Sequence, residues 1–312
     1  MKIAFLDAKT MGDLPNMKNF EDFGEFIPYP STPLDEVPGR IADVDVVITN
    51  KIMISRKAME QAPKLRLICV AATGMNNVDH AAAKDHNIAV KNVVDYSTHS
   101  VAQQTFSLIL SLLNNPAHHD DYVRSGAYSR NDIFTYLGKP YWQLNEKRFG
   151  IVGLGNIGRK VAQIAEAFGC EIVYYSSSGK DRHDRYQRLE LDALLQSAHV
   201  VSVHAPLDDK TQDLITYDKI KLMQQDAILI NTSRGGIINE ADLAKATDEG
   251  LIRGAAVDVF TKEPLPADHP YLQVKHSDRL LLSPHIAWAS EESRALLLDR
   301  IYENIRSFWQ DQ

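Results

Sequence analysis

The sequence has little cysteine, no excess of positive charge and no long apolar run. Only Cys69 and Cys170 occur, without a Cys-x-x-Cys pair, so a disulfide framework or a metal site is not expected, and a reducing cytoplasm is the default compartment. The formal charge of −7 excludes a global cationic field for nucleic acid or anionic lipid. No apolar run reaches the ~20 residues of a membrane helix, and Met1–Asp7 meets an acid before a signal-peptide core forms.

The size and composition of the chain indicate an ordinary globular protein. The 312 residues suggest two domains, at about 150 residues for each. Apolar residues make up 44% and charged residues 24% of the chain, which argues against a disordered or fibrous protein.

Short apolar, β-branched runs recur along the whole chain, with helical patterns between many of them. Strands that alternate with helices predict βαβ units and parallel sheets buried on both faces, and therefore an α/β fold. The expected strands are Ile3–Leu6, Val44–Thr49, Leu67–Ala71, Ile88–Lys91, Phe149–Val152, Ile172–Tyr175, Val200–His204, Ala227–Asn231, Ala255–Val259 and Leu280–Ser283.

Two longer helices are predicted where the chain could pass between domains. One runs from about Thr98 to Leu113, before Asn114-Asn115-Pro116, and the other follows Ser290. One interpretation is that residues 1 to about 97 form one domain to which the last helix returns, around a central second domain. The other is two consecutive domains with the last helix packed locally. The pattern of residues leaves both open.

A glycine-rich loop follows the expected strand at 149–152. Gly153, Gly155 and Gly158 form a G-x-G-x-x-G pattern that opens a helix inside a βαβ unit, the context that indicates a dinucleotide site. Gly153 suits a tight turn, Gly155 admits a pyrophosphate to the backbone, and Gly158 allows close helix–strand packing. The helix N-terminus then offers N–H groups to the phosphates.

The end of the next strand bears on the choice between NAD and NADP. An acid there bonds the adenosine ribose and repels a 2′-phosphate, but this chain has Ser176, followed by Ser177 and the cation Lys180. Hydroxyls and cations suit a 2′-phosphate, so NADP(H) is slightly favoured over NAD(H). The alternative is a solvated loop in which Asp181 bonds the ribose.

Three polar segments follow the carboxyl ends of successive expected strands, at 231–236, 258–264 and 283–288. In a doubly wound sheet, ligands bind at that edge. The segments present an arginine, acids and a histidine. An arginine grips a carboxylate, a histidine moves a proton near neutral pH, and a neighbouring carboxylate orients the histidine. This set suits the reduction of a carbonyl group by a nicotinamide cofactor.

Together these motifs resemble the D-isomer-specific 2-hydroxyacid dehydrogenase family over nearly the whole chain. The matching motifs are G-L-G-N-I-G at 153–158, N-T-S-R-G-G at 231–236, D-V-F-T-K-E-P at 258–264 and S-P-H-I-A-W at 283–288. The resemblance implies two doubly wound parallel-sheet domains with a cleft between them. A flavodoxin-like substrate domain would take residues 1–97 and 288–312, and a Rossmann cofactor domain residues 98–287.

The resemblance also implies roles for individual residues. Arg234 would bind substrate, Glu263 would partner the histidine, and His285 would be the acid or base. Asp258 would hold the nicotinamide carboxamide. Substrate contacts are expected from Thr73, Gly74, Met75, Asn50, Lys51, Arg234 and Trp288. Cofactor contacts are expected from Gly153, Gly155, Asn156, Ile157, Gly158, Ser176, Ser177, Lys180, His204, Pro206, Thr211, Thr232, Ser233, Arg234, Asp258 and His285.

Within the family, the chain looks most like hydroxypyruvate and glyoxylate reductases. The expected reaction is NAD(P)-dependent reduction of hydroxypyruvate to D-glycerate or of glyoxylate to glycolate, by a homodimer joined through the cofactor domain. The alternatives are a D-lactate-type enzyme, a phosphoglycerate dehydrogenase, and a cofactor-sensing binding protein like the corepressors built on this fold. Nucleic-acid and membrane partners are not expected.

Overall fold

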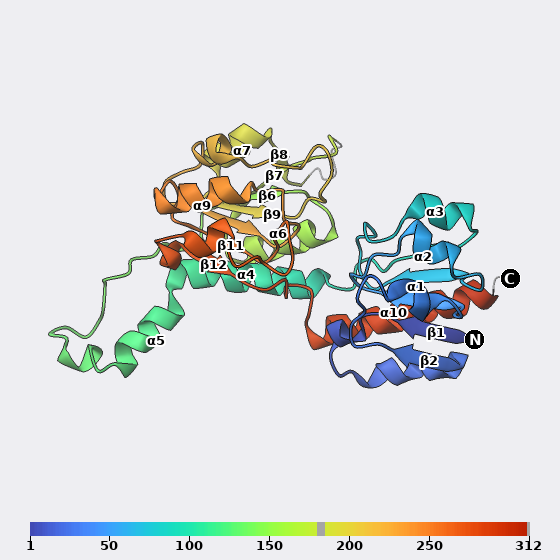
Figure 1. Ribbon diagram of the computed structural model, residues 1–312. Helices are drawn as coiled ribbons and strands as arrows, with labels where there is room; N and C mark the ends of the chain where they lie inside the picture. Colours follow the sequence, from blue (N-terminus) through green and yellow to red (C-terminus); the bar gives the residue numbers. More distant parts are fainter. Residues whose placement is uncertain (180–184, 311–312) are drawn as a thin grey trace. The chain divides into compact units, whose positions relative to one another are not determined.

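The chain divides into two units, each built on its own parallel sheet (Figure 1). The computed structural model describes residues 1–179 and 185–310. Unit 1 comprises Met1–Ser97 with Ala289–Gln312, and unit 2 comprises Thr98–Trp288. Two sheets with only parallel pairing confirm the predicted α/β fold class.

Unit 1 has a five-stranded sheet in the order β2-β1-β3-β4-β5. This is the flavodoxin-like order, which reverses direction between β1 and β3. The strands are β1 (Lys2–Phe5), β2 (Glu25–Pro28), β3 (Val46–Thr49), β4 (Leu67–Val70) and β5 (Ala89–Lys91). The helices are η1 (Ala8–Met11), η2 (Pro15–Phe23), α1 (Val37–Ile41), α2 (Arg56–Glu60), α3 (His80–Asp85) and α10 (Glu291–Gln310).

The core of unit 1 forms because its central strands are buried on both sides. Every residue of β3 and β4 is buried, as a parallel sheet between helices requires. The last helix, α10, packs against β4 and η2 and buries Ile301 and Ile305. It begins after Ser290, as predicted, and the Ser290 hydroxyl accepts the N–H of Ser293 at 3.2 Å.

Unit 2 has a seven-stranded sheet in the order β12-β11-β10-β9-β6-β7-β8, the Rossmann pattern, which reverses between β6 and β9. The strands are β6 (Arg148–Val152), β7 (Glu171–Tyr175), β8 (Gln187–Arg188), β9 (Val200–Val203), β10 (Ile228–Asn231), β11 (Gly254–Val257) and β12 (Leu280–Leu282). The helices are α4 (Thr98–Asn114), α5 (Pro116–Arg124), η3 (Tyr128–Arg130), α6 (Asn156–Ala167), α7 (Leu191–Ser197), α8 (Tyr217–Ile220), α9 (Glu240–Asp248), η4 (Pro270–Gln273) and η5 (Ser277–Arg279).

Helices cover both faces of this second sheet. One apolar cluster joins the strands to α7, α8 and α9, with Leu194, Ile220 and Leu243 completely buried. Another joins them to α4 and α6, with Ile109 and Val161 completely buried. The result is a rigid platform whose strand ends lie along one carboxyl edge.

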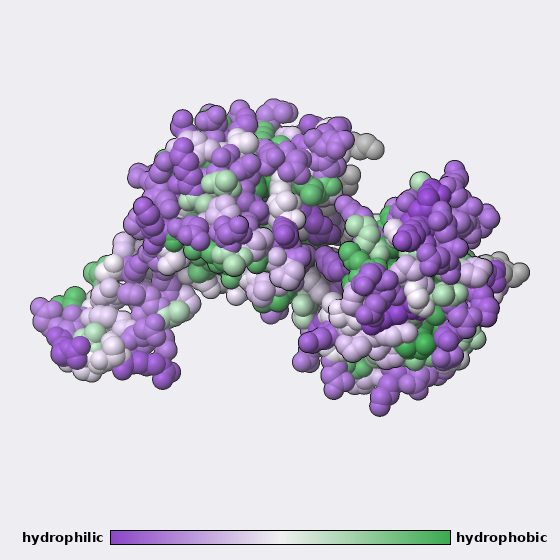
Figure 2. All heavy atoms as spheres, in the orientation of Figure 1, coloured by the Kyte–Doolittle hydropathy of each residue, from purple (hydrophilic) through white to green (hydrophobic). Residues whose placement is uncertain are grey.

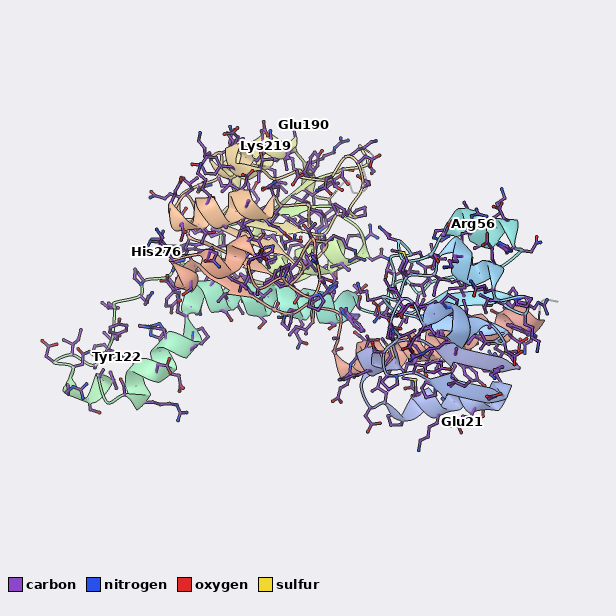
Figure 3. All side chains as sticks on the ribbon, in the orientation of Figure 1. Glu21, Arg56, Tyr122, Glu190, Lys219 and His276 are labelled. Atoms are coloured by element: carbon purple, nitrogen blue, oxygen red, sulfur yellow. The ribbon has the colours of Figure 1, made fainter. Side chains whose placement is uncertain are left out.

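Residues 115–142, called the arm here, extend from the end of α4. Pro116 lacks a backbone N–H donor, so α4 ends at Asn114, as predicted. Proline also suits the first turn of a helix, and α5 starts at Pro116. Figure 1 shows α5 standing away from the sheet of unit 2. No residue of α5 is buried. The Tyr122 ring, labelled in Figure 3, stacks on Tyr136 with 4.1 Å between ring centroids.

Candidate active site

The glycine loop between β6 and α6 has the sterics that a dinucleotide site requires. Gly153 has φ +96°, and a Cβ there would lie 2.6 Å from the backbone nitrogen of Ala205. A Cβ on Gly158 would lie 2.3 Å from the Gly153 carbonyl oxygen. At Gly155 the opposite holds, since no atom stands within 4 Å of a Cβ position. The backbone at Gly155 is therefore open to a ligand.

A cavity of about 510 Å³ opens at this loop. It is lined by Gly153, Leu154, Gly155, Tyr174, Ser176, Ser177, Ser178, His204, Pro206, Asp208, Asp209 and Lys210. All of them except Tyr174, which lies within β7, come from the loops after β6, β7 and β9, at the point where the strand order reverses. The open glycine, the N-terminus of α6 and the cavity together fit a dinucleotide. Asn156 and Ile157 form the first turn of α6.

Ser176 stands at the end of β7, where an acid would discriminate between NAD and NADP. It is buried, and its hydroxyl lies 3.3 Å from that of Ser178. Lys180, expected to contact the cofactor, lies outside the described residues. Lys210 lines the cavity and was not predicted from the sequence. Its only sequence signal is its place in the loop after β9.

His204 follows β9 and lies against the cavity. Its Nε2 is 2.8 Å from the Ser202 hydroxyl, and burial lowers its pKa to about 3, so the ring is neutral near pH 7. Its Nδ1 has no hydrogen-bond partner among residues 1–179 and 185–310. Thr211 is fully buried and supports the same loop, because its hydroxyl donates to the Pro206 carbonyl at 2.7 Å.

The segments that carry Arg234, Glu263 and His285 start side by side. Strands β10, β11 and β12 are parallel neighbours, with Asn231 paired to Val257 and Val257 to Leu282. Their following loops therefore leave the same edge of the sheet. This register brings together residues that are up to 51 positions apart in the chain (285 minus 234).

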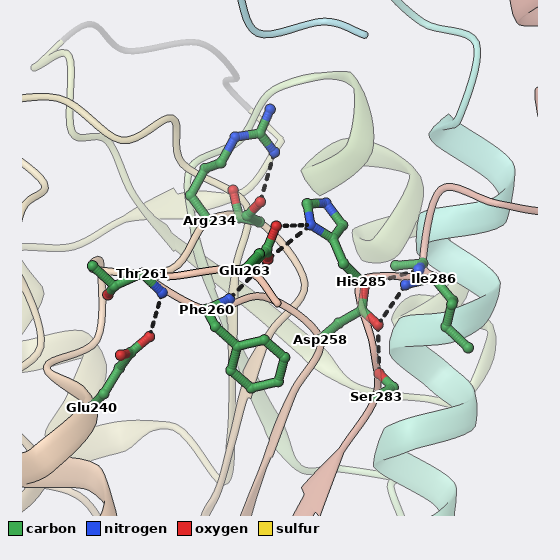
Figure 4. Close-up of polar contacts among 11 residues, drawn as sticks. Arg234, Glu240, Asp258, Phe260, Thr261, Glu263, Ser283, His285 and Ile286 are labelled. Carbon is green, nitrogen blue, oxygen red and sulfur yellow. Dashed lines mark hydrogen bonds and ion pairs between the residues drawn. The ribbon is translucent and has the colours of Figure 1, made fainter. Parts of the chain in front are cut away.

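His285 and Glu263 form a close pair at this edge (Figure 4). The His285 Nδ1 lies 2.8 Å from Oε1 and 2.7 Å from Oε2 of Glu263. The side chains remain 21% and 29% exposed, so a ligand can reach them. Oε1 of Glu263 also accepts the N–H of Phe260 at 3.0 Å. His285 has φ +54°, a left-handed backbone conformation that is uncommon outside glycine and is often found at functional sites.

Asp258 anchors the segment on which His285 stands. Its Oδ1 accepts the Ser283 hydroxyl at 2.5 Å and the Ile286 N–H at 3.0 Å, and its Oδ2 accepts the Ala287 N–H at 2.8 Å. Burial raises the pKa of Asp258, and these hydrogen bonds oppose the rise. The sequence had suggested only a nicotinamide contact for Asp258, and the anchoring of 283–287 is a second role that it missed.

Arg234 lies in a turn held by its own neighbours. Asn231 donates to the Arg234 carbonyl at 2.9 Å and accepts the Ser233 N–H at 3.1 Å. The Ser233 hydroxyl donates to the Ala205 carbonyl at 2.5 Å, next to the cofactor loop. Thr232 pairs with the Thr105 hydroxyl of α4 at 3.0 Å. The half-buried guanidinium of Arg234 donates to the Ser233 carbonyl at 2.7 Å.

In unit 1, the loop that contains Asn50 and Lys51 follows β3, where the order of that sheet reverses. The buried Asp7 carboxylate, at the end of β1, accepts the N–H groups of Asn50 at 2.8 Å and Lys51 at 2.7 Å. Burial raises the pKa of Asp7 against the effect of these bonds. Asp7 was not predicted from the sequence as a site residue.

The loop of Thr73, Gly74 and Met75 follows β4 in the same unit. Asn92 donates to the Thr73 carbonyl at 2.6 Å, and the Thr73 hydroxyl donates to the Val93 carbonyl at 3.1 Å. In the described part of the chain, the backbone N–H groups of Thr73 and Gly74 donate no hydrogen bond to another residue. They remain open to an anionic ligand. Trp288, half-buried, is the last residue of unit 2.

Comparison with known proteins identifies the class that this fold and site define. The family model for the D-isomer specific 2-hydroxyacid dehydrogenase NAD binding domain matches residues 106–287. The chain therefore belongs to the D-isomer-specific 2-hydroxyacid dehydrogenase family. It is an NAD(P)-dependent oxidoreductase that reduces 2-oxo acids to 2-hydroxy acids. In residues 1–179 and 185–310, no helix has the length and apolar character needed to cross a bilayer.

Individual relatives match over almost the whole chain. A hydroxypyruvate reductase from Blautia hydrogenotrophica is 36% identical over 99% of this chain and 97% of its own length. A glycerate dehydrogenase from Methylorubrum extorquens is 32% identical over 98% and 96%. Among solved structures, an acyclic imino acid reductase in complex with NADPH and D-Arg has a TM-score of 0.88 and 27% identity, over 100% and 98%.

Proposed function

We propose that the protein reduces hydroxypyruvate to D-glycerate and glyoxylate to glycolate, with His285 as the proton donor. The observation that carries this proposal is the hydrogen-bonded pair of His285 and Glu263. These residues follow β12 and β11, and Arg234 follows the neighbouring strand β10. The relatives named as hydroxypyruvate reductase and glycerate dehydrogenase support the choice of substrate.

Glu263 orients His285 for this role. Because the Glu263 carboxylate accepts the Nδ1–H of His285, the ring is held in one orientation, with Nε2 on the side away from Glu263. Nε2 then donates a proton to the substrate oxygen as the carbonyl is reduced, and the Glu263 carboxylate stabilises the charged ring before transfer. The nicotinamide cofactor, when bound, supplies the hydride.

Arg234 and the loops of unit 1 would hold the acid. A guanidinium binds a carboxylate through two parallel N–H bonds, and we assign Arg234 that contact. The open N–H groups of Thr73 and Gly74 offer a second anion site, and Asn50 and Lys51 offer polar contacts. We assign Met75 and Trp288 to the wall of the substrate pocket. Residues 1–97 and 288–312 would then form the substrate-binding domain, and residues 98–287 the cofactor domain. These proposed bounds differ from those of units 1 and 2 only at Trp288, which lies in unit 2.

We propose that NADP(H) is preferred over NAD(H). The support is local: serines occupy 176–178 where an acid would repel a 2′-phosphate, and the cation Lys210 lines the same cavity. Asp208 and Asp209 also line the cavity and oppose that preference. The proposed cofactor contacts remain those named from the sequence, from the glycine loop through Ser176, Ser177 and His204 to Asp258.

We further propose a homodimer joined through unit 2, with the arm at the interface. The arm exposes Phe134 at 89% and Leu137 at 75%, a cost that burial against a second copy would relieve. On the face shown in Figure 2, apolar and hydrophilic residues are mixed on the arm. In light-scattering measurements, the double variant Phe134→Asp, Leu137→Asp should be a monomer. An unchanged dimer mass would place the interface elsewhere.

We propose a reducing, cytoplasmic setting, supported by the two cysteines. Both are free and buried, and burial raises the pKa of Cys69 to about 12 and that of Cys170 to about 11. Such thiols are inert and need no disulfide partner.

The test of the function is a steady-state comparison of NADPH and NADH. The substrates are hydroxypyruvate, glyoxylate, pyruvate and 3-phosphohydroxypyruvate. The proposal expects kcat/KM to be highest for hydroxypyruvate or glyoxylate. Pyruvate as the best substrate would favour a D-lactate-type enzyme, and the phosphorylated acid would favour a phosphoglycerate dehydrogenase. No oxidation of either cofactor by any of these acids would favour a cofactor-sensing binding protein.

A further inference from the structure

Unit 2 contains a second histidine–glutamate pair, formed by His269 and Glu240. Glu240 is the first residue of α9, and His269 precedes η4. The His269 Nε2 lies 2.8 Å from Oε2 of Glu240, and the two side chains are only 7% and 14% exposed. Neither residue belongs to a recognisable motif, and neither lines the cofactor cavity.

The hydrogen bonds of His269 define its protonation. Its Nδ1 accepts the backbone N–H of Tyr271 at 3.2 Å, so that nitrogen carries no proton. Nε2 therefore carries the proton of a neutral ring and donates it to Glu240. Glu240 lies in the first turn of α9, so its carboxylate stands at the positive end of the helix. His269 holds Oε2 of this carboxylate, which leaves Oε1 to accept another hydrogen bond.

The other oxygen of Glu240 holds the backbone between Asp258 and Glu263. Oε1 accepts the N–H of Thr261 at 2.7 Å. The adjacent N–H, that of Phe260, donates to Glu263 at 3.0 Å. Figure 4 shows both bonds on the same stretch of chain. The Thr261 N–H belongs to the Phe260–Thr261 peptide, and the Phe260 N–H belongs to the peptide before it. The two peptides share the Phe260 Cα, so Glu240 holds the backbone directly next to the N–H group that binds Glu263, the partner of His285.

The same peptide also contacts the turn that carries Arg234. A Cβ on Gly235 would lie 2.0 Å from the Phe260 carbonyl carbon and 2.2 Å from the Thr261 nitrogen. The two backbones are thus in direct contact next to Arg234. A displaced peptide at 260–261 would disturb the Glu263 side and the Arg234 side together.

Aromatic contacts hold His269 itself in place. Its ring packs against Tyr271 and Phe260, with ring centroids 4.8 Å and 6.2 Å away. The ring is therefore held by these two aromatic contacts and by hydrogen bonds at both nitrogens. A side chain held in this way can define the position of the carboxylate that it binds.

We propose that Glu240 and His269 are positioning residues for the reduction. They hold the Phe260–Thr261 backbone so that Glu263 and Arg234 keep the arrangement that His285 requires. This inference rests on the proposed function of Glu263 and His285. It adds two residues, 45 and 16 positions before His285 (285 minus 240 and 285 minus 269), that do not line the cofactor cavity.

The first test compares Glu240→Ala with Asp242→Ala. Asp242 lies in the same first turn of α9 and accepts a backbone N–H, that of Tyr217, at 2.8 Å, but it does not hold the 258–264 segment. With NADPH and hydroxypyruvate, Glu240→Ala should lower kcat by about 10- to 100-fold, the cost of misplacing a catalytic group. Asp242→Ala should leave kcat unchanged, and both variants should keep the NADPH Kd. Equal kcat values for the two variants would overturn the proposal.

The second test separates positioning from general loss of stability. Glu240→Ala is also made in a Glu263→Gln background, as a double-mutant cycle. If Glu240 acts through Glu263, most of its effect on kcat disappears in that background. A full effect there overturns the inference. If Glu263→Gln alone keeps wild-type kcat, the proposed function of Glu263 fails instead.

A third pair of variants keeps the proposal testable if Glu240→Ala does not fold. His269→Gln retains an N–H donor that can reach Glu240, whereas His269→Leu retains none. The proposal expects kcat to fall in His269→Leu and to recover in His269→Gln, with similar melting temperatures. Equal kcat values in these two variants would contradict it.

Discussion

The Ser283 hydroxyl donates a 2.5 Å hydrogen bond to the Asp258 carboxylate and so joins the end of β11 to the segment that carries His285. The same carboxylate accepts the N–H groups of Ile286 and Ala287. One buried acid therefore holds a side-chain hydroxyl before the proposed proton donor and two backbone N–H groups after it. The left-handed backbone of His285 is maintained by this anchoring.

Replacement of Asp258 by Asn should therefore affect both stability and activity. The Asp258 carboxylate accepts three hydrogen bonds on two oxygens. The asparagine side chain has one acceptor oxygen, and its NH2 group would face one of the donors, so at least one buried N–H or O–H group loses its partner. That loss costs about 1–3 kcal/mol, to be measured by urea unfolding, with kcat falling as well. Ser283→Ala, which removes only one donor, is the milder control. An unfolding midpoint equal to that of the wild type would refute the anchoring role.

Replacement of His285 by Ala should abolish proton donation while sparing the cofactor site. General acid catalysis contributes about 10²- to 10⁴-fold, and kcat should fall within that range. The NADPH Kd, followed by fluorescence titration, should stay close to the wild-type value, because the cavity that fits the dinucleotide follows β6, β7 and β9. Turnover at the wild-type rate would remove His285 from the mechanism.

Two glycines of the cofactor loop should respond differently to the same added methyl group. Gly155→Ala meets no atom within 4 Å, so the protein should fold normally but bind NADPH at least about tenfold more weakly, since the methyl occupies the pyrophosphate approach. Gly153→Ala meets Ala205 at 2.6 Å with φ +96° and should lose about 1–3 kcal/mol of stability. Thermal unfolding and NADPH titration of both variants check this. The reverse pattern would contradict the loop assignment.

The neutral ring of His204 should make the fold sensitive to acid. Its pKa is about 3 in the folded protein against an ordinary 6.5. Between these values the unfolded chain binds a proton that the folded chain does not, so stability falls as the pH drops from 6.5 toward 3. The slope for one group is at most about 1.4 kcal/mol per pH unit, and above pH 6.5 this contribution is constant.

The measurement is urea unfolding between pH 4.5 and 7.5, with His204→Gln compared against the wild type. The variant should have a shallower loss of stability in acid. His276→Gln is the matched control, because His276 is exposed (Figure 3). The raised pKa values of Asp7 and Asp258 act in the opposite direction, but they are common to all three proteins. Identical slopes in wild type and His204→Gln would refute the assignment of a neutral ring.

Cofactor choice should depend on Ser176. Ser176→Asp places a carboxylate at the cavity wall, where it repels a 2′-phosphate and bonds a ribose. The ratio of kcat/KM for NADPH to that for NADH should fall by at least about tenfold. Ser125→Asp, in the arm, adds the same charge away from the cavity. If both variants keep the wild-type ratio, another residue decides the preference.

Much of the fold could be predicted from local pattern. The strands at the centre of each sheet are short apolar runs, because both faces of a parallel sheet are buried, and all ten expected strands occur within two residues of their predicted ends. Two of the four edge strands, β2 and β8, were missed. β2 contains exposed and half-buried residues and ends in proline, and β8 has only two residues, so neither shows the buried-strand pattern.

The candidate site likewise contains residues that the sequence predicted and residues that it did not. The residue types and their order indicated Arg234, Glu263, His285 and the glycine loop, because glycine sterics and functional groups are properties of single residues. The anchors were decided by tertiary structure alone. Asp7, Glu240 and His269 matter through partners 21 to 44 positions away. Such partners meet only when parallel strands align in register and the loops after them leave one edge, and no short stretch of sequence encodes that register.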